Sequence, residues 1–402
     1  MDLLIQFTIK LFMSTVRENL RKLVPFALVY SWVELIQSLC LSPYSFIAET
    51  SNASVYSEKW LIRISDQVTE LSKILMIIMV AYFLSNMVLS LIPEEGKDTS
   101  KLPWVLFLMT WILYTASNNF NNYYAQIPFW LLLGLIAFVL AFIARKLKML
   151  SFNQRAVVFV ISIFSTYSLS KYLARHMSSS PDLLLQMASL SLLGPGPNHV
   201  LSVVFWSSIA VIMQGLGLLV PYILQTPAND LILTSENVNA ALSGHLDNIP
   251  HLFSLYTLRD SFAMFGGLGM VLPLLLAVLI ESKKLNKPYH FHLSILCFLP
   301  VLFDQPLAFL VGLPVILEPL ILLPMLAVTI LSEVIGAIVL TLKWVHPAVF
   351  IVPEGTPNLI FTFLASNGDW RYFIIVTFII IVSILIYLPF IKRAFQREAL
   401  YD

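Results

Sequence analysis

The segment that decides the fold is residues 303–320, which read FDQPLAFLVGLPVILEPL. It is apolar enough for the interior of a bilayer, yet it contains two acidic residues, three prolines and a glycine. Each proline removes a backbone donor and opposes a continuous helix, and an unpaired backbone group in lipid is costly. Such a segment is tolerated at membrane depth when it is broken into short helices that pack inside protein or line a wet cavity. The pattern is typical of the substrate sites of transporters.

The composition of the whole chain favours a membrane protein. Hydrophobic residues make up 58% of the 402 residues and charged residues only 12%, whereas charged residues average about 25% in soluble proteins. The net charge of +1 gives no basic surface for nucleic acid. The chain has neither a P-loop nor a glycine-rich dinucleotide motif, and no Cys/His cluster has the spacing of a zinc site. We therefore expect no cofactor, no metal and no nucleic-acid partner.

Apolar runs follow one another along the chain. A helix that crosses the bilayer core needs about 20 apolar residues, and by that measure about ten spans are expected. They are residues 23–41, 72–93, 103–117, 128–144, 156–172, 198–220, 261–281, 291–303, 315–342 and 372–391. The predicted fold class is thus an all-α integral membrane protein with about ten transmembrane helices.

Positive charges between these runs indicate an orientation. They gather after the fourth, seventh and last spans, at Arg145, Lys146, Lys148, Arg155, Lys283, Lys284, Lys287, Lys392, Arg393 and Arg397. Because Lys and Arg are enriched in cytoplasmic loops, these loops and both termini are predicted to face the cytoplasm. Residues 1–22 mix apolar and basic positions, and we interpret them as an amphipathic helix on the cytoplasmic face.

The chain also divides into two halves. Residues 23–175 form hydrophobic runs with few breaks, whereas proline and glycine interrupt the runs repeatedly from about residue 198 onward. We interpret residues 23–175 as a scaffold and residues 176–402 as the half that binds substrate and moves. The polar segment 225–259 is too long for an ordinary loop and is predicted to fold against the second half.

Several short motifs occur in a fixed order along the chain. They are Val16-Arg17-Glu18-Asn19 leading to Pro25, Ile212-Met213-Gln214-Gly215, Gly266-Gly267-Leu268-Gly269, Asp304-Gln305-Pro306 with Gly312-Leu313-Pro314 and Glu318-Pro319, and Thr356-Pro357 with Asn367-Gly368-Asp369-Trp370-Arg371. This order resembles membrane subunit IIC of the lactose/cellobiose (diacetylchitobiose) type in the bacterial phosphoenolpyruvate-dependent sugar phosphotransferase system. The resemblance covers nearly the full chain.

The resemblance implies a homodimer of ten-helix protomers in the bacterial plasma membrane. It implies a static dimerisation half beside a mobile sugar-binding half that contains two re-entrant hairpins and moves as an elevator. It also implies a sugar substrate and cytosolic partners, in which a IIA protein supplies a separate IIB protein that donates phosphate. The expected function is translocation of a β-linked disaccharide.

The chain departs from the family at polar positions. The family's histidine in Gly-Ile-His-Gly and its glutamate in Asn-Glu-Pro correspond to Gln214 and Gln305. A glutamine binds a hydroxyl as donor and acceptor but cannot take a proton, so no catalytic residue is assigned and an enzymatic role stays open. The serine of Gly-Gly-Ser-Gly has become Leu268. These changes motivate an alternative, a degenerate IIC-like protein that has lost phosphotransfer and acts as a sensor, receptor or facilitator.

The expected substrate-binding residues each have a structural alternative. They are Gln214, Gly267, Asp304, Gln305, Asp369, Trp370 and Arg371. The indole of Trp370 can stack on a sugar ring beside the charged pair, or it can anchor the chain at the membrane interface. Acidic residues within apolar sequence are usually functional, but Asp304 can also lie at a hairpin end among headgroups. Glu333, with small neighbours, is interpreted as a residue of close helix packing.

Overall fold

The described part of the chain is built almost entirely from helices. The computed structural model describes residues 2–51, 56, 58–92, 102–115, 130–147, 151–176, 181–229, 231–313 and 315–398. Helices account for 77% of the structure, and the described residues contain no strand. The prediction of an all-α fold is therefore confirmed.

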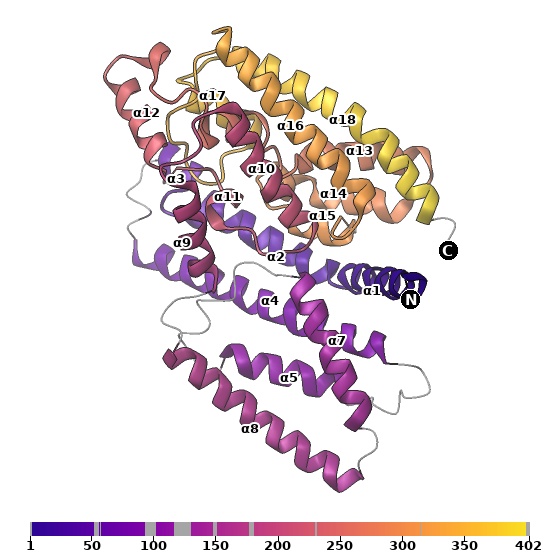
Figure 1. The fold of residues 1–402 in the computed structure, drawn as a ribbon. Helices are drawn as coiled ribbons and strands as arrows, with labels where there is room; N and C mark the ends of the chain where they lie inside the picture. Colours follow the sequence, from indigo (N-terminus) through magenta and orange to yellow (C-terminus); the bar gives the residue numbers. More distant parts are fainter. Residues whose placement is uncertain are drawn as a thin grey trace.

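The first half of the chain contains mostly long helices. They are α1 (Asp2–Arg21), α2 (Val24–Ile36) with the π-helical turn η1 (Gln37–Leu41), α3 (Phe46–Thr50), α4 (Lys59–Leu91), α5 (Leu102–Thr115), α7 (Trp130–Leu147), α8 (Phe152–His176) and α9 (Pro181–Leu193). Helix α4 packs against α5, α7 and α2, and α5 packs against α8. We call α4, α5, α7 and α8 the first lobe, which lies at the bottom of Figure 1.

The second half contains shorter helices joined by turns. They are α10 (Val200–Gly215), α11 (Tyr222–Gln225), α12 (Ile232–Leu242), η4 (Leu246–Asn248), η5 (Leu255–Asp260), α13 (Val271–Lys284), α14 (Pro288–Leu302), α15 (Leu307–Gly312), α16 (Pro319–Thr341), α17 (Asn358–Ala365) and α18 (Arg371–Glu398). Helix α16 packs against α10, α18 and η5, and α13 packs against α14 and α18. We call these elements the second lobe.

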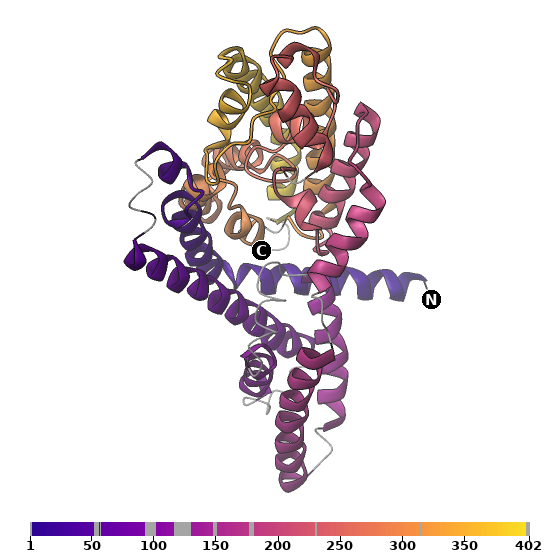
Figure 2. The ribbon, with the colours of Figure 1, turned by 90° about the vertical axis from the view of Figure 1, so that its left-hand side faces the viewer.

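Helices α1 and α2 lie between the two lobes (Figures 1 and 2). The six-residue helix α15 packs against both of them, and the Ala308 N–H donates to Ser31 Oγ over 3.3 Å. An ion pair also joins Arg17 of α1 to Glu318, the N-cap of α16. The broken segment 303–320 thus contacts both α1 and α2, and α14 also packs against α2. The division into a scaffold and a moving half stays a prediction.

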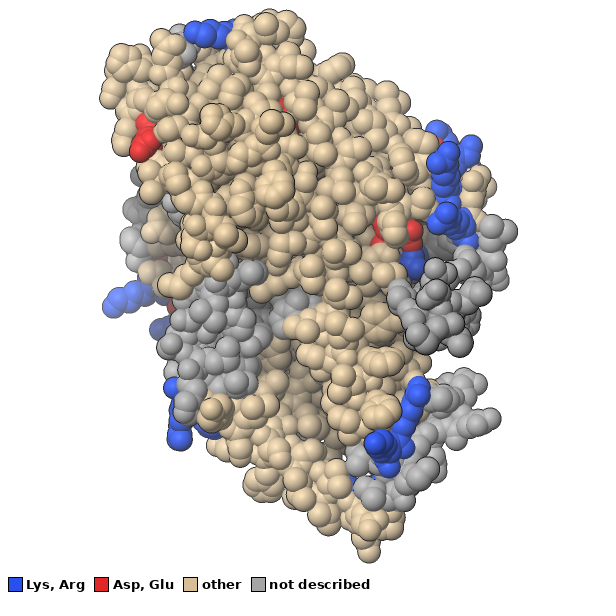
Figure 3. Space-filling model, in the orientation of Figure 1, with Lys and Arg blue, Asp and Glu red and all other residues tan. Residues whose placement is uncertain are grey.

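Several helices have the length and composition of membrane spans. Four stretches are long and apolar enough to cross a bilayer: Val24–Leu41, Lys59–Leu91, Pro319–Thr341 and Arg371–Arg397. Three described helices are apolar but shorter: Pro103–Thr115, Val200–Gly215 and Pro288–Leu302. The face seen in Figure 3 is largely uncharged, with Lys and Arg near its rim, as suits contact with lipid. The chain is a multi-pass membrane protein; the count of ten spans and the orientation of the termini stay predictions.

The structure differs from the predicted spans in several places; helix α4, for example, begins at Lys59 instead of residue 72. Helix α13 begins at Val271 instead of residue 261, because positive φ values at Gly266, Gly267 and Gly269 turn the chain. Helix α10 ends at Gly215 instead of continuing to residue 220. Helix α9 was not expected, because its 13 residues are shorter than the length required of a span.

Candidate functional site

The segment Gly266–Gly269 forms a turn that only glycine accommodates. Gly266, Gly267 and Gly269 have φ values of +78°, +90° and +79°, in the left-handed region that side chains disfavour. A Cβ added at Gly266 would lie 2.5 Å from the backbone nitrogen of Leu272. The turn thus breaks an apolar run immediately before α13 and leaves backbone carbonyls that need partners.

Gln214 supplies one of these partners. It lies in the last turn of α10, and its Nε2 atom donates to the Leu268 carbonyl oxygen over 3.1 Å. The side chain is half-buried. The motif around residue 214 and the glycine motif, 54 residues apart in the chain, therefore meet in the structure.

Asp304 joins the same region to a second broken segment. It follows α14 in a left-handed conformation, with φ of +59°. One oxygen of its carboxylate accepts a hydrogen bond of 2.9 Å from Asn358 Nδ2, at the first residue of α17. The carboxylate also interacts with the backbone N–H groups of Gly266 and Gly267. One acidic side chain thus connects the turn after α14, the glycine turn and the start of α17.

Gln305 and Pro306 follow in the same turn. The ring of Pro306 lies beside Gly267, where an added Cβ would be 3.2 Å from it. The Gln305 backbone N–H donates to the Pro300 carbonyl over 2.8 Å, but its half-buried side chain forms no hydrogen bond within the described part of the chain. The amide of Gln305 is therefore available to a ligand. Pro314, the next proline of segment 303–320, lies outside the described residues.

A buried ion pair anchors the loop before the glycine turn. Arg259, 1% exposed, donates from Nε to Asp260 Oδ1 over 2.6 Å and also donates to the carbonyls of Leu224 and Thr226. Asp260 Oδ2 accepts from the Ala228 N–H over 2.8 Å. This pair was not among the site residues predicted from the sequence, although two adjacent charges beside an apolar run are a signal of function. Asn358 was not predicted either.

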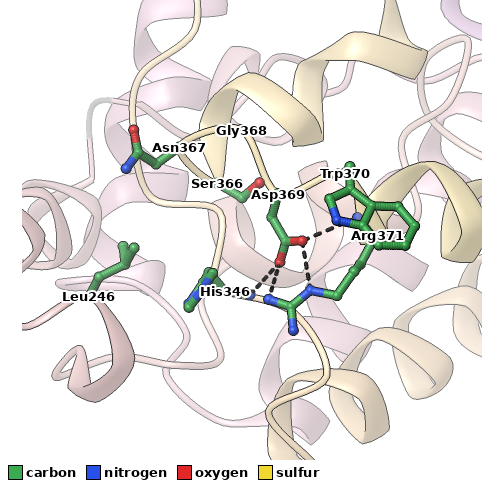
Figure 4. Close-up of a pocket in the computed structure, with 8 residues that line it drawn as sticks. All are labelled: Leu246, His346, Ser366, Asn367, Gly368, Asp369, Trp370 and Arg371. Atoms are coloured by element: carbon green, nitrogen blue, oxygen red, sulfur yellow. Dashed lines mark hydrogen bonds and ion pairs between the residues drawn. The ribbon is translucent and has the colours of Figure 1, made fainter.

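The motif residues Asp369, Trp370 and Arg371 form a separate group (Figure 4). They line an open hollow of about 480 Å³ together with Leu246, His346, Ser366, Asn367 and Gly368. The Asp369 carboxylate accepts two hydrogen bonds of 2.7 Å from the Arg371 guanidinium and one of 2.9 Å from the His346 N–H. Trp370 is 63% exposed.

The hydrogen bonds at Asp369 determine its ionisation. Burial by itself would raise the pKa of the carboxyl group, but the hydrogen bonds from Arg371 and from the His346 N–H outweigh it, and the pKa of Asp369 is lowered from its ordinary value. Asp369 is therefore an anion at neutral pH, and it holds the Arg371 side chain in place.

The two groups lie apart along α16. Gly215 packs against Leu322 near the start of this helix, whereas His346 follows its end. The 23 residues of α16 correspond to about 34 Å. Likewise, Asp304 contacts Asn358, the first residue of α17, whereas Asp369 comes after Ala365, the last residue of the same helix. The structure thus brings together Gln214, Gly267, Asp304 and Gln305, and it places Asp369, Trp370 and Arg371 elsewhere.

Comparison with known proteins gives two matches. No protein-family model matches the chain. The PTS system cellobiose-specific EIIC component of Lactococcus lactis subsp. lactis (strain IL1403) is 32% identical over 139 residues, which are 35% of this chain and 28% of that protein. The crystal structure of the transporter ChbC, the IIC component from the N,N'-diacetylchitobiose-specific phosphotransferase system, aligns with 96% of this chain and 94% of its own, at 17% identity and a TM-score of 0.43. The resemblance to a IIC component is confirmed by the curated match, which spans little more than a quarter of that relative.

Proposed function

We propose that this chain is the sugar-translocating IIC component of a bacterial phosphoenolpyruvate-dependent phosphotransferase system, and that its sugar is a β-linked disaccharide. The sequence match to a cellobiose-specific EIIC component supports the proposal. The phosphoryl group comes from a separate cytosolic IIB protein, which a IIA protein supplies. The chain lies in the plasma membrane with both termini in the cytoplasm.

The observation that carries this proposal is the meeting of four motifs at the Gly266–Gly269 turn. Gln214 donates to the Leu268 carbonyl, Pro306 packs beside Gly267, and Asp304 accepts from Asn358. Broken helices that meet around unpaired backbone groups are the arrangement in which transporters hold substrates. Sugar hydroxyls both donate and accept hydrogen bonds, and amide, carboxylate and backbone groups match them in both roles.

The residues have different roles in this proposal. Gln305 binds a hydroxyl with its side-chain amide, which has no hydrogen-bond partner among the described residues, and Asp304, held by Asn358, accepts from a second hydroxyl. Gln214 contributes another amide, and Gly267 lets the sugar approach the backbone. Neither glutamine can take a proton from the sugar, so any phosphoryl transfer proceeds without a general base at positions 214 and 305.

Trp370 forms a second sugar contact in the proposal. Its indole face is exposed, and the ion pair between Asp369 and Arg371 fixes polar groups beside it. Because this group lies beyond the far end of α16, we assign it to the mouth of the sugar pathway and not to the site at the glycine turn.

Movement of the second lobe past the first completes the proposal. The scaffold, residues 23–175, forms a static homodimer. Residues 176–402 bind the sugar and move as a rigid body across the membrane, which is an elevator-type movement. The contact of α15 with α1 and α2 is the surface across which the moving half passes its scaffold.

The test is uptake of labelled cellobiose, diacetylchitobiose and lactose into proteoliposomes, with and without phosphorylated IIB. We expect saturable uptake of one of these sugars, with sugar phosphate formed only when IIB is present. Trp370→Ala is expected to weaken sugar uptake strongly, whereas Trp104→Ala, at another exposed tryptophan, leaves it unchanged. Binding without phosphorylation, or phosphorylation only in a Gln214→His/Gln305→Glu variant, would show that the chain has lost the reaction. An absence of any sugar binding would refute the function itself.

A further inference from the structure

A basic surface lies at one end of the second lobe. In Figure 3, Lys and Arg gather at the rim of the molecule where α18 ends. The cations come from the turn between α13 and α14 and from the last turns of α18, and they are Lys283, Lys284, Lys287, Lys392, Arg393 and Arg397. Lys287 is half-buried and the others are exposed. We call these six residues the basic patch.

Contacts between helices bring the two parts of the basic patch together, although they lie far apart in the chain. His290, near the start of α14, stacks on Phe395 of α18 with the ring centroids 4.6 Å apart. Helix α13 also packs against α18 and α14. The turn after α13 and the end of α18 therefore form one continuous surface and not two separate loops.

The cations of the basic patch are mostly without partners. Lys284 pairs with Glu281 over 3.2 Å, whereas the other five form no hydrogen bond or ion pair within the described part of the chain. The cations at the end of α7 differ, because Arg145 donates to a backbone carbonyl of α4 and Lys146 lies over the Phe142 ring. Those cations are bound to their own lobe, whereas the basic patch is available to another molecule.

Exposed apolar side chains accompany the charges of the basic patch. Leu285 and Tyr289, on either side of the turn between α13 and α14, are 36% and 46% exposed. Tyrosine and arginine are enriched among the residues that contribute most to protein–protein binding. Attraction of lipid headgroups, by contrast, requires only the charges. The mixture of arginine, tyrosine and apolar surface therefore favours a protein partner.

The basic patch and the proposed sugar site lie at opposite ends of the same helices. Helix α13 begins directly after the glycine turn, and α14 ends just before Asp304. The 14 residues of α13 correspond to about 21 Å. At the other end, the Tyr289 hydroxyl lies 3.5 Å from the carbonyl oxygen of Gly312, the last residue of α15. A partner on the basic patch thus contacts the helices that position the sugar site without touching the sugar-binding residues.

We propose that the basic patch is the docking surface for the phosphorylated IIB protein. The inference rests on the proposed function, in which IIB donates the phosphoryl group to the sugar. A phosphoryl group adds negative charge, and a cluster of Lys and Arg attracts a partner of that charge and speeds its approach. Because the basic patch and the sugar site belong to the same lobe, a docked IIB protein stays aligned with the sugar when that lobe moves.

The first test measures the binding of IIB to the full chain in nanodiscs of uncharged phosphatidylcholine. The probe is the phosphorylated IIB protein of the uptake test. The variant Lys283→Gln/Lys392→Gln/Arg393→Gln/Arg397→Gln removes four exposed charges of the basic patch. Its association rate with IIB is expected to fall about 10- to 1,000-fold at low salt, which is the range of electrostatic steering. Its sugar affinity is expected to be unchanged, which also shows that the variant is folded.

The matched control removes four exposed charges from the first lobe. It is Lys59→Gln/Arg63→Gln/Lys146→Gln/Arg155→Gln, and it has the same net charge as the variant of the basic patch. This control is expected to bind IIB at the wild-type rate. An equal loss in both variants overturns the proposal, because IIB would then respond to charge in general and not to this surface.

A second measurement separates the IIB protein from anionic lipid. The salt dependence of the association rate is measured in nanodiscs of phosphatidylcholine, with and without phosphatidylglycerol. We expect the rate of the wild type to fall steeply with ionic strength in both lipids, and the rate of the basic-patch variant to fall less. If the basic patch serves lipid headgroups, wild type and variant bind IIB equally in phosphatidylcholine, and the proposal is overturned.

Failure of the docking surface and failure of the transport function give different results. A wild type that binds sugar but no phosphorylated IIB refutes the docking surface alone. A wild type that binds IIB through the basic patch but binds no sugar supports the docking surface and refutes the proposed transport. Binding of neither refutes both.

Discussion

Helix α4 and the segment between α14 and α18 satisfy their backbone groups in different ways. Helix α4 runs without a break through 33 residues, from Lys59 to Leu91, so its interior N–H and carbonyl groups pair within the helix. The second region is broken at Asp304, at Leu317 and at Lys343, all with positive φ. Side chains such as that of Asn358 form the hydrogen bonds between its short helices and turns. The broken region therefore depends on individual polar residues, and single substitutions are expected to affect it more.

The largest effect is expected at Arg259. Replacement by Leu leaves Asp260 buried without its cation, and loss of one partner of a buried pair costs about 3–5 kcal/mol. Lys22→Met on α1 is the control, since it removes an exposed pair with Glu18 that contributes about 0–1 kcal/mol. Thermal unfolding in detergent measures both. Equal losses would show that the ion pair in η5 has no special structural role.

The next effect is expected at the glycine turn. Gly266→Ala forces a Cβ against the Leu272 backbone at a φ of +78°, and backbone strain and overpacking each cost about 1–3 kcal/mol. Gly194→Ala has a similar φ of +60° but nothing within 4 Å of the added Cβ, so only the strain applies. The two melting temperatures measure the difference. A Gly266→Ala protein as stable as Gly194→Ala would contradict the tight turn.

A smaller loss is expected from Tyr387→Phe. The Tyr387 hydroxyl donates to the Gly269 carbonyl over 2.5 Å, and a buried acceptor left unpaired costs about 1–3 kcal/mol. Tyr44→Phe, at a side chain that is 70% exposed, is expected to change stability little. Hydrogen exchange of residues 265–272 is expected to rise in Tyr387→Phe alone. Unchanged hydrogen exchange at residues 265–272 would show that this hydroxyl does not stabilise the turn.

The smallest effect is expected at Asp369 and depends on pH. Its pKa is lowered in the folded protein, so its stabilising contribution is complete above the unfolded pKa of about 3.9 and is lost as pH falls through the lower folded value. Wild type and Asp369→Asn are therefore expected to differ in melting temperature at neutral pH and to converge below about pH 4. A difference that grows on acidification would contradict this sign.

Much of the local structure was predictable from the sequence. The low charge and long apolar runs indicated a helical membrane protein, and Pro306 and Pro319 lie at the starts of α15 and α16, as expected from proline's missing donor. The glycine motif at residues 266–269 was recognised, but its consequence for the span 261–281 was not. A count of apolar residues does not register that three positive φ values interrupt a helix.

What the sequence alone determined about this protein is its class, its helix-breaking positions and the residue types available to a sugar, because hydropathy and backbone chemistry are local properties. Tertiary structure decided which of those residues meet. It joined Gln214, Leu268, Asp304 and Asn358 through contacts between segments far apart in the chain. It also placed Trp370 beyond the other end of α16 and left Glu333 without a hydrogen-bond partner among the described residues. These outcomes depend on how whole helices pack against one another, and a local pattern of residues does not predict that packing.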